Sequence, residues 1–209
     1  MRLDKAATPY LAATLLPAAI LAGLRRPGLA LPLAVAGGFF AFFFRDPERL
    51  APGDGTAILA PADGKVVTAG PAVAGVAPPG DWLQVSIFLS PLDVHVNRSP
   101  VSGRVTRVEY RPGAFHPAYK HQASTDNERS EVWIESASGK FVYRQVAGIM
   151  ARRVVCRVSE GSKVTAGARV GLIKFGSRTD LFMPPETTIL VAPGDRVRGG
   201  ETVVGRLGR

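Results

Sequence analysis

Two long uncharged segments open the chain. Residues 6–24 and 27–44 contain no charged side chain, and only Arg25 and Arg26 separate them. Each segment is 18 or 19 residues long, close to the roughly 20 residues that a helix needs to cross a bilayer. A helix packed on a soluble domain usually keeps one polar face, which neither segment has. The pattern therefore predicts a membrane-associated helical hairpin over residues 1–45.

Two alternatives to a membrane hairpin remain open. A cleaved signal peptide also places basic residues before an apolar stretch, but its removal would leave the second apolar segment still to be buried. A buried soluble hairpin is the other alternative. The pattern also leaves open whether the hairpin crosses the bilayer or is shallow and re-entrant. Arg25 and Arg26 ordinarily favour the cytoplasm, whereas a full crossing with a cytoplasmic C-terminal domain would place them outside.

From Asp46 onward the pattern changes to short β-rich segments. Residues 83–89, 141–146 and 187–191 combine β-branched, aromatic and other apolar residues, and Gly and Pro interrupt the chain at short intervals. This spacing is typical of an all-β barrel or sandwich. No sustained helical periodicity follows the hairpin. The sequence therefore predicts a mainly β domain over residues 46–209.

A weak internal repeat lies within this β-rich part. Residues 161–171 and 194–205 both read as a turn, a short strand, a glycine turn and a second strand, and residues 60–67 are related to them. These segments resemble the flattened half-barrels of biotinyl and lipoyl domains. A carrier domain of that kind usually presents a lysine beside a methionine, and the sequence has no such pair. We therefore interpret the repeat as scaffold.

Composition narrows the class of partner. The net charge is +9 and the pI is about 10.3, which favours a polyanion such as nucleic acid or an anionic lipid surface. The basic residues are scattered, which argues against a nucleic-acid-binding tail, so we expect no nucleic-acid partner. The single cysteine, Cys156, excludes an intrachain disulfide and any multi-cysteine metal site, and we expect no metal.

The dipeptide Gly176-Ser177 carries the most specific chemistry. Glycine permits strained backbone geometry, so the serine hydroxyl could attack the preceding carbonyl and form an ester. Elimination from that ester leaves dehydroalanine, and hydrolysis then leaves a pyruvoyl group at a new N-terminus. Such a ketone can condense with a substrate amine and act as an electron sink. Taken alone, Gly-Ser is a common turn.

Three further segments supply groups that could act on Ser177. Asp63 lies in a turn-forming Asp-Gly pair. His95 follows an apolar segment, and Asp93 lies two residues before it, on the same side of an extended chain; Asp93 could therefore orient the imidazole or stabilise its charge. Residues 127–129 form a polar cluster. Each of these groups also has a purely structural interpretation. Asp63 could be a turn residue, His95 a structural histidine, and residues 127–129 a solvated loop.

Taken in order, these segments resemble the phosphatidylserine decarboxylase family. The resemblance is carried by the apolar hairpin and by residues 43–47, 61–66, 88–91 with Asp93 and His95, 127–129 and 175–178. The length and the Gly-Ser-Arg site resemble the short, prokaryotic form. Long members carry Gly-Ser-Thr and a second histidine three residues after the first, where this sequence has Arg98.

The resemblance implies a pyruvoyl-dependent proenzyme that cuts itself between Gly176 and Ser177. Residues 1–176 would form the β-chain and residues 177–209 the α-chain, held together as a heterodimer. Ser177 would become the covalent pyruvoyl cofactor.

The resemblance and the residue chemistry together suggest a role for each candidate group. We expect His95 to take the proton of the serine hydroxyl, because a neutral imidazole suits that task, and Asp63 to orient His95. His116 and His121 are weaker candidates that we expect to be solvated.

The implied reaction converts phosphatidylserine to phosphatidylethanolamine at the cell membrane, with the catalytic domain on the cytoplasmic side. Groups that would bind the substrate, through its phosphate above all, are Arg45, Arg111, Asn127 and Arg129. A decarboxylase of a related serine lipid such as archaetidylserine, or a non-enzymatic, membrane-anchored lipoyl-like adaptor, are the alternatives. The sequence leaves open whether the protein also forms a homo-oligomer.

Overall fold

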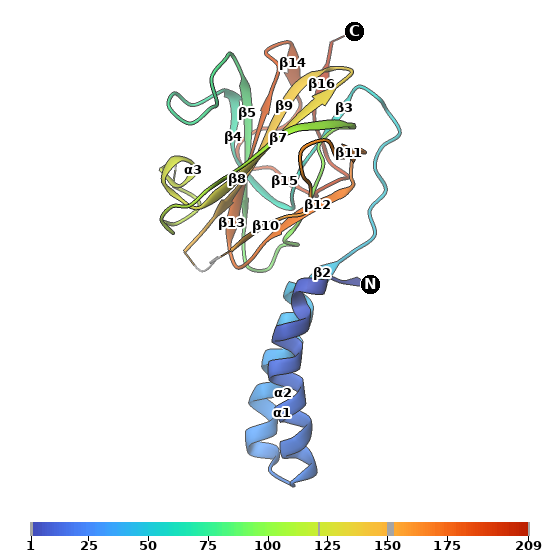
Figure 1. Ribbon diagram of the computed structural model, residues 1–209, viewed down its shortest axis with the longest axis vertical. Helices are drawn as coiled ribbons and strands as arrows, with labels where there is room; N and C mark the ends of the chain where they lie inside the picture. Colours follow the sequence, from blue (N-terminus) through green and yellow to red (C-terminus); the bar gives the residue numbers. More distant parts are fainter. Residues whose placement is uncertain (1, 121, 150–152, 209) are drawn as a thin grey trace. The chain divides into compact units, whose positions relative to one another are not determined.

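The computed structural model describes residues 2–120, 122–149 and 153–208 (Figure 1). The chain divides into two compact units, Met1–Glu48 and Arg49–Arg209. We call them the hairpin unit and the β unit and describe each by itself.

The hairpin unit consists of two apolar helices joined by a tight turn. Its elements are β1 (Arg2–Leu3), a 3-10 helix (Lys5–Ala7), α1 (Thr8–Gly23), α2 (Pro27–Phe43) and β2 (Arg45–Asp46). Arg25 lies in the turn with φ of 57°. The continuous helical segment Lys5–Gly23 is long and apolar enough to cross a membrane, whereas Pro27–Phe43 is shorter. The predicted apolar helical hairpin is therefore confirmed.

The base of the hairpin is closed by backbone pairing. β1 pairs antiparallel with β2, so that Arg2 lies opposite Asp46. Asp4 accepts a hydrogen bond from the amide of Ala6 at 2.8 Å and so caps the first helical turn. Most of the large side chains along both helices point outward, and Leu16 and Leu31 are about two-thirds exposed.

The β unit contains many short strands and a single short helix among its described residues. Its elements are β3 (Ala57–Leu59), β4 (Gly64–Pro71), β5 (Leu83–Leu89), β6 (Val96–Arg98), β7 (Gly103–Arg111), α3 (Ala123–Asp126), β8 (Arg129–Ser136), β9 (Gly139–Ala147), β10 (Val154–Cys156), β11 (Lys163–Val164), β12 (Arg169–Ile173), β13 (Ser177–Met183), β14 (Thr187–Ile189), β15 (Arg196–Val197) and β16 (Val203–Leu207). The prediction of a mainly β fold is confirmed.

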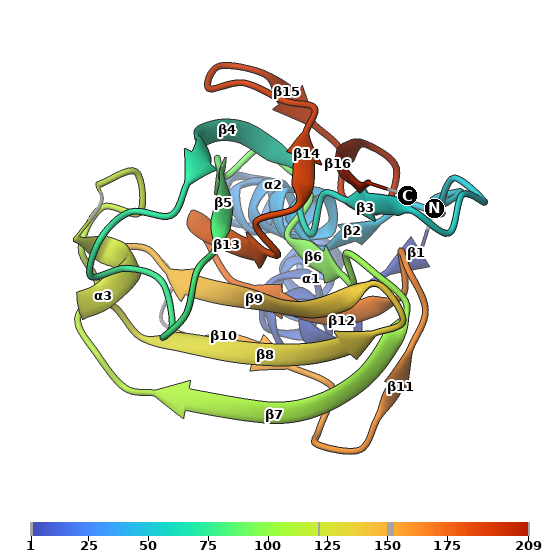
Figure 2. The same cartoon turned by 90° about the horizontal axis from the view of Figure 1, so that it is seen from above.

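One large antiparallel sheet organises the β unit. Its eight strands follow the order β11-β7-β8-β9-β13-β5-β4-β15, and the sheet curls strongly when it is seen from above (Figure 2). Two three-stranded sheets, β10-β12-β6 and β14-β16-β3, complete the unit. The strand β13 lies near the middle of the large sheet, hydrogen-bonded to β9 on one side and to β5 on the other.

The internal repeat corresponds to a repeated backbone geometry. Gly167, between β11 and β12, and Gly200, between β15 and β16, have nearly equal φ of 79° and 77°. Gly167 donates to the carbonyl of Ser99 at 2.8 Å, and Gly200 donates to the carbonyl of Ala60 at 2.9 Å. Both glycines therefore make the same kind of turn against a preceding segment. The repeat serves as scaffold of the half-barrel.

The strand β13 is buried on both faces of the sheet. Side chains alternate along a strand, so Leu181 and Met183 belong to the main apolar core. Phe182 belongs to a separate apolar cluster with Val76 and Val142. This double burial explains why the middle of the sheet can hold both apolar and polar side chains away from water.

Candidate active site

Ser177 is the first residue of β13 and is fully buried. It lies opposite Leu89 at the end of β5 and opposite Ala147 at the end of β9. Among the described residues, its hydroxyl oxygen has no hydrogen-bond partner. A buried polar group without a partner is rare in a folded protein and often marks a functional position. Ser177 thus puts a buried hydroxyl at the end of a rigid element, directly after the predicted cleavage point.

The two residues before Ser177 have left-handed backbone geometry. Phe175 has φ of 57° and Gly176 has φ of 71°. Glycine adopts this region freely, but a bulky residue such as phenylalanine does so at a cost of order 1–3 kcal/mol. The strained turn directs the chain into β13 at the predicted cleavage point.

His95 contacts this turn directly. The amide of Gly176 donates a hydrogen bond to Nε2 of His95 at 3.2 Å, and Nδ1 of His95 lies 2.9 Å from the carbonyl oxygen of Asp93. Because Nε2 accepts and a carbonyl can only accept, Nδ1 carries the proton and the ring is neutral. The buried imidazole therefore presents its Nε2 lone pair to the backbone beside the Gly176-Ser177 bond.

Asp93 orients His95 through its backbone. Its carbonyl receives the Nδ1 proton, whereas its carboxylate accepts hydrogen bonds from the amide of Ser90 at 2.8 Å and the hydroxyl of Ser90 at 2.7 Å. The carboxylate also pairs with Arg196 at 3.3 Å. The side chain of Asp93 thus fixes the turn that carries the carbonyl.

Asp63 lies in a polar corner with Arg49. Its carboxylate accepts hydrogen bonds from Arg49 Nη2 and from the amide of Gly199, both at 2.8 Å. Burial raises the pKa of Asp63, while the Gly199 hydrogen bond and Arg49 oppose that shift and the charge of Asp93 adds to it. The carboxylates of Asp63 and Asp93 are thus close enough to interact electrostatically. The expected role of Asp63 in orienting His95 stays a prediction.

A small apolar pocket lies directly beside the turn. It has a volume of about 160 Å³ and is lined by Phe88, Pro91, Pro117, Ala118, Tyr119, Gly148, Ile149, Phe175 and Gly176. At Gly148, the two chain segments come so close that a Cβ atom would overlap the carbonyl oxygen of Gly176. That oxygen belongs to the carbonyl that a serine nucleophile would attack, so Gly148 fixes the surroundings of the reacting atom.

The residue after Ser177 anchors the start of β13 on the other face of the sheet. Arg178 is fully buried, and it donates from Nε to Asp180 at 2.6 Å and from Nη2 to Ser86 at 2.9 Å. Burial by itself would raise the pKa of Asp180, but Arg178, Arg144 and the Ser86 hydroxyl together hold that pKa below its usual value. This network ties β13 to β5 next to the predicted cut.

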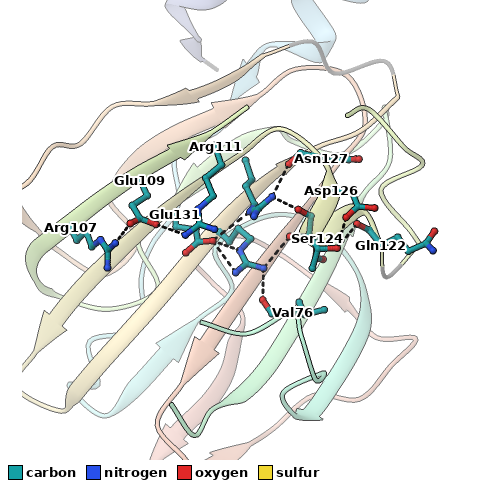
Figure 3. Close-up of polar contacts among 12 residues, drawn as sticks. Val76, Arg107, Glu109, Arg111, Gln122, Ser124, Asp126, Asn127 and Glu131 are labelled. Carbon is teal, nitrogen blue, oxygen red and sulfur yellow. Dashed lines mark hydrogen bonds and ion pairs between the residues drawn. The ribbon is translucent and has the colours of Figure 1, made fainter. Parts of the chain in front are cut away.

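The charged network continues across the sheet to Glu131 and Arg129, and Figure 3 shows the polar contacts around Glu131. The strand register places Glu131 opposite Arg144, and Arg144 opposite Asp180. Glu131 binds Arg144 at 2.9 Å and lies 3.6 Å from Arg129. Burial and the neighbouring Arg144 lower the pKa of Arg129. Because Arg129 shares a face with Arg178 and not with Ser177, its guanidinium lies on the far side of the sheet from the serine hydroxyl.

Asn127 is engaged by backbone groups. Its side chain accepts from the amide of His116 at 2.8 Å and donates to the carbonyls of His116 and Ala147 at 2.9 and 2.7 Å. It therefore fastens the loop of residues 112–122 to the end of β9, one residue before Gly148. Asn127 therefore affects the pocket indirectly, by holding the loop that carries the lining residues Pro117, Ala118 and Tyr119.

The remaining candidates lie elsewhere. Arg45 belongs to the hairpin unit, where it donates to the carbonyl of Phe42 at 2.8 Å and stacks over the Phe42 ring. Arg98 is buried and donates to the carbonyl of Gly167 at 3.0 Å. His116 is exposed, and His121 lies outside the described residues.

The chain matches known proteins over most of its length. Residues 36–205 match the family model described as phosphatidylserine decarboxylase. A relative from Pelodictyon phaeoclathratiforme is 48% identical over 168 residues, which cover 80% of this chain and 79% of the relative. A relative from Granulibacter bethesdensis is 50% identical over 174 residues, covering 81% and 71%. One from Chlorobium luteolum is 42% identical over 210 residues, covering 95% and 99%. All three are named phosphatidylserine decarboxylase proenzyme. On this similarity, the chain belongs to the phosphatidylserine decarboxylase family.

Proposed function

We propose that the chain cuts itself between Gly176 and Ser177 and then decarboxylates phosphatidylserine to phosphatidylethanolamine. The observation that carries this proposal is the contact of His95 Nε2 with the Gly176 amide, beside a buried serine hydroxyl that has no hydrogen-bond partner in the described part of the chain. The names of the relatives, which include both the substrate and the word proenzyme, support it.

The geometry suits an attack of Ser177 on the preceding carbonyl. The Oγ proton passes to Nε2 of His95, which gives up its hydrogen bond to the Gly176 amide. A bond forms between Oγ and the carbonyl carbon of Gly176, and the peptide C–N bond breaks as its nitrogen takes a proton. Loss of the Ser177 Cα proton then breaks the Cβ–O bond, which leaves a Gly176 carboxylate and a dehydroalanine. Water converts the dehydroalanine to the pyruvoyl group and releases ammonia.

The two fragments would stay together after the cut. Residues 177–209 begin with β13, which pairs along its length with β5 and along most of it with β9, and both of these strands belong to residues 1–176. The ladders and the buried Arg178–Asp180 pair would hold the new N-terminus in place. The expected heterodimer of fragments therefore rests on the position of β13 in the sheet.

The same residues would serve the decarboxylation. A pyruvoyl carbonyl at position 177 supplies the electron sink that loss of an α-carboxylate requires. Its place fits the start of β13, where no described residue binds the serine hydroxyl. His95 holds a basic nitrogen at this position and can move a proton there. The apolar pocket beside Gly176 can receive part of the substrate.

The hairpin and the charge of the chain suit a membrane substrate. The outward leucines of both helices favour an apolar surrounding, and the net charge of +9 favours anionic lipid. Both features support a location at the cell membrane. That the β unit lies on the cytoplasmic side stays a prediction. Contacts of the lipid phosphate with Arg45, Asn127 or Arg129 stay predictions.

The sequence left two alternative functions open, and the comparisons weigh on only one of them. The chain is a member of a decarboxylase family, so a non-enzymatic lipoyl-like adaptor is no longer favoured. A related serine lipid such as archaetidylserine has the same amine and carboxylate, and the site does not distinguish it. Release of CO₂ from purified protein with each lipid in matched micelles separates the two. Faster turnover of phosphatidylserine supports the proposal, and turnover of archaetidylserine alone would overturn it.

A further inference from the structure

Three loops at one end of the large sheet carry exposed apolar side chains. The antiparallel register places the ends of β5 and β9 beside the start of β13. The loops that follow β5 and β9, and the loop that precedes β8, therefore meet next to Gly176. They expose Leu92 by 68%, Tyr119 by 60%, Ile149 by 56% and Phe115 by 39%. We call these four side chains the apolar rim.

The apolar rim surrounds the pocket of the candidate active site. Tyr119 and Ile149 themselves line that pocket. Pro91, which precedes Leu92, and Pro117, two residues after Phe115, line it too. The ring of Tyr119 lies edge-on to Phe88 inside the pocket, with centroids 6.2 Å apart. The rim and the pocket thus form one apolar surface that leads to Gly176. Exposed apolar patches of this kind mark sites of interaction.

The charges near the apolar rim favour one kind of partner. Among the described residues of these loops and of the turn before β13, the charged side chains are Asp93, Lys120, Asp126, Glu128, Arg153 and Lys174. Glu128 is buried and accepts the amide of Val154 at 3.1 Å. The Asp93 carboxylate is occupied by Ser90. Three cations, Lys120, Arg153 and Lys174, therefore outnumber Asp126, the exposed carboxylate among these described residues. Apolar side chains flanked by an excess of basic ones are the composition that binds anionic lipid interfaces.

We infer that the apolar rim is a membrane-contacting surface of the β unit itself. It seats on an anionic bilayer surface, so that a lipid headgroup enters the pocket beside Gly176 from the bilayer and not from water. The inference rests on the proposed function for the identity of that headgroup. The contact with the bilayer rests on the exposed side chains and charges alone. It is separate from any tethering by the hairpin unit.

Quenching by brominated lipid tests the contact directly. Full-length Leu92→Trp and Phe115→Trp are mixed with vesicles of phosphatidylglycerol and phosphatidylcholine that carry bromine on the acyl chains. Leu190→Trp is the matched control, because Leu190 is 49% exposed but belongs to none of the rim loops. The quenching measured for the parent protein is subtracted, because Trp82 and Trp133 also fluoresce. The inference predicts added quenching in both rim variants and none in the control.

Equal quenching in rim variants and control would overturn the inference. Absence of quenching at the rim would also overturn the inference, and would indicate that something other than lipid, such as a protein partner, covers these side chains. Quenching requires no turnover, so this result is independent of whether the protein decarboxylates phosphatidylserine. If the rim is quenched but no CO₂ is released, the proposed function fails and the membrane surface stands.

A kinetic comparison tests the consequence for substrate entry. The double variant Leu92→Ser/Phe115→Ser changes two rim residues that do not line the pocket. Its ratio of turnover on vesicle phosphatidylserine to turnover on short-chain, monomeric phosphatidylserine should fall about tenfold, because only the vesicle substrate needs the surface. Leu190→Ser should keep the parent ratio. An unchanged ratio in the double variant would contradict entry from the bilayer.

Discussion

Nε2 of His95 accepts the backbone amide of Gly176 at 3.2 Å, while Nδ1 of the same ring is held by the carbonyl of Asp93. The two contacts fix both the tautomer and the orientation of a buried imidazole. A basic nitrogen is thereby held one residue from Ser177 before any substrate binds.

His95→Ala should slow the conversion of the single chain into two fragments by a factor of about 10²–10⁴, the usual contribution of a positioned general base. The extent of cutting after purification is read by gel and intact mass. His116→Ala is the matched control, because His116 is exposed, and it should be cut normally. Normal cutting together with normal turnover in His95→Ala would remove His95 from the site.

Gly148→Ala should slow cutting by about 100-fold, because a Cβ there would overlap the carbonyl oxygen of Gly176 and displace the reacting carbonyl. Gly53→Ala is the control, since no atom lies within 4 Å of a Cβ at that position. The rate of cutting during cell-free synthesis is the measurement. If Gly148→Ala is cut as fast as Gly53→Ala, the packing at this carbonyl has no part in the reaction.

Asp180→Asn should destabilise the protein at neutral pH by about 3–5 kcal/mol, because it leaves the buried Arg178 without its charge partner. Unfolding in denaturant is measured in a Ser177→Ala background, so that each protein is one chain. Asp54→Asn, which breaks an exposed pair with Arg206, should have a small effect.

The same pair predicts a pH dependence. The pKa of Asp180 is lowered in the folded protein from its ordinary value of 3.8. The carboxylate therefore contributes stability above pH 3.8, and that contribution is lost as the pH falls through the folded-state pKa. The difference in unfolding free energy between parent and Asp180→Asn should shrink below about pH 4. A difference that grows in acid would contradict the pairing.

A chain that begins at Asp46 should still cut itself after Gly176. Every candidate reactive group lies in the β unit, and this start keeps Arg49, which binds Asp63 at 2.8 Å. Its sedimentation with anionic vesicles should fall, leaving a salt-sensitive remainder. A folded but uncut protein would show that the hairpin helps to build the site.

The elements were largely predictable from the sequence. The apolar hairpin follows from two charge-free segments, and residues 83–89 correspond to β5 because apolar residues dominate a strand buried on both faces. Residues 141–146 lie within β9, whereas residues 187–191 extend past the end of β14 at Ile189. Local pattern fixes the type of an element better than its end.

The contacts of the site were less predictable. The i and i+2 spacing suggested that the Asp93 side chain could orient His95. In the structure the backbone carbonyl of Asp93 makes the contact, from a turn and not from an extended strand, and sequence does not show which group of a residue is used. The positions of Gly148 and Arg49 depend on strand register and loop packing between distant segments. The sequence carries no signal that singles out Arg49 or Gly148.

Self-cleavage after Gly176 is the central claim. It is tested most directly by the intact masses of the purified protein and of the variants Ser177→Ala and Thr179→Ala. Thr179 is the matched control for Ser177, since it is buried on the same face of β13 and its hydroxyl also has no partner among the described residues. The account predicts that the parent and Thr179→Ala yield fragments 1–176 and 177–209, the smaller with an N-terminal carbonyl that reacts with a hydrazide. Ser177→Ala should remain a single chain of 209 residues. An uncut parent, or a Ser177→Ala protein cut after Gly176, would contradict the account.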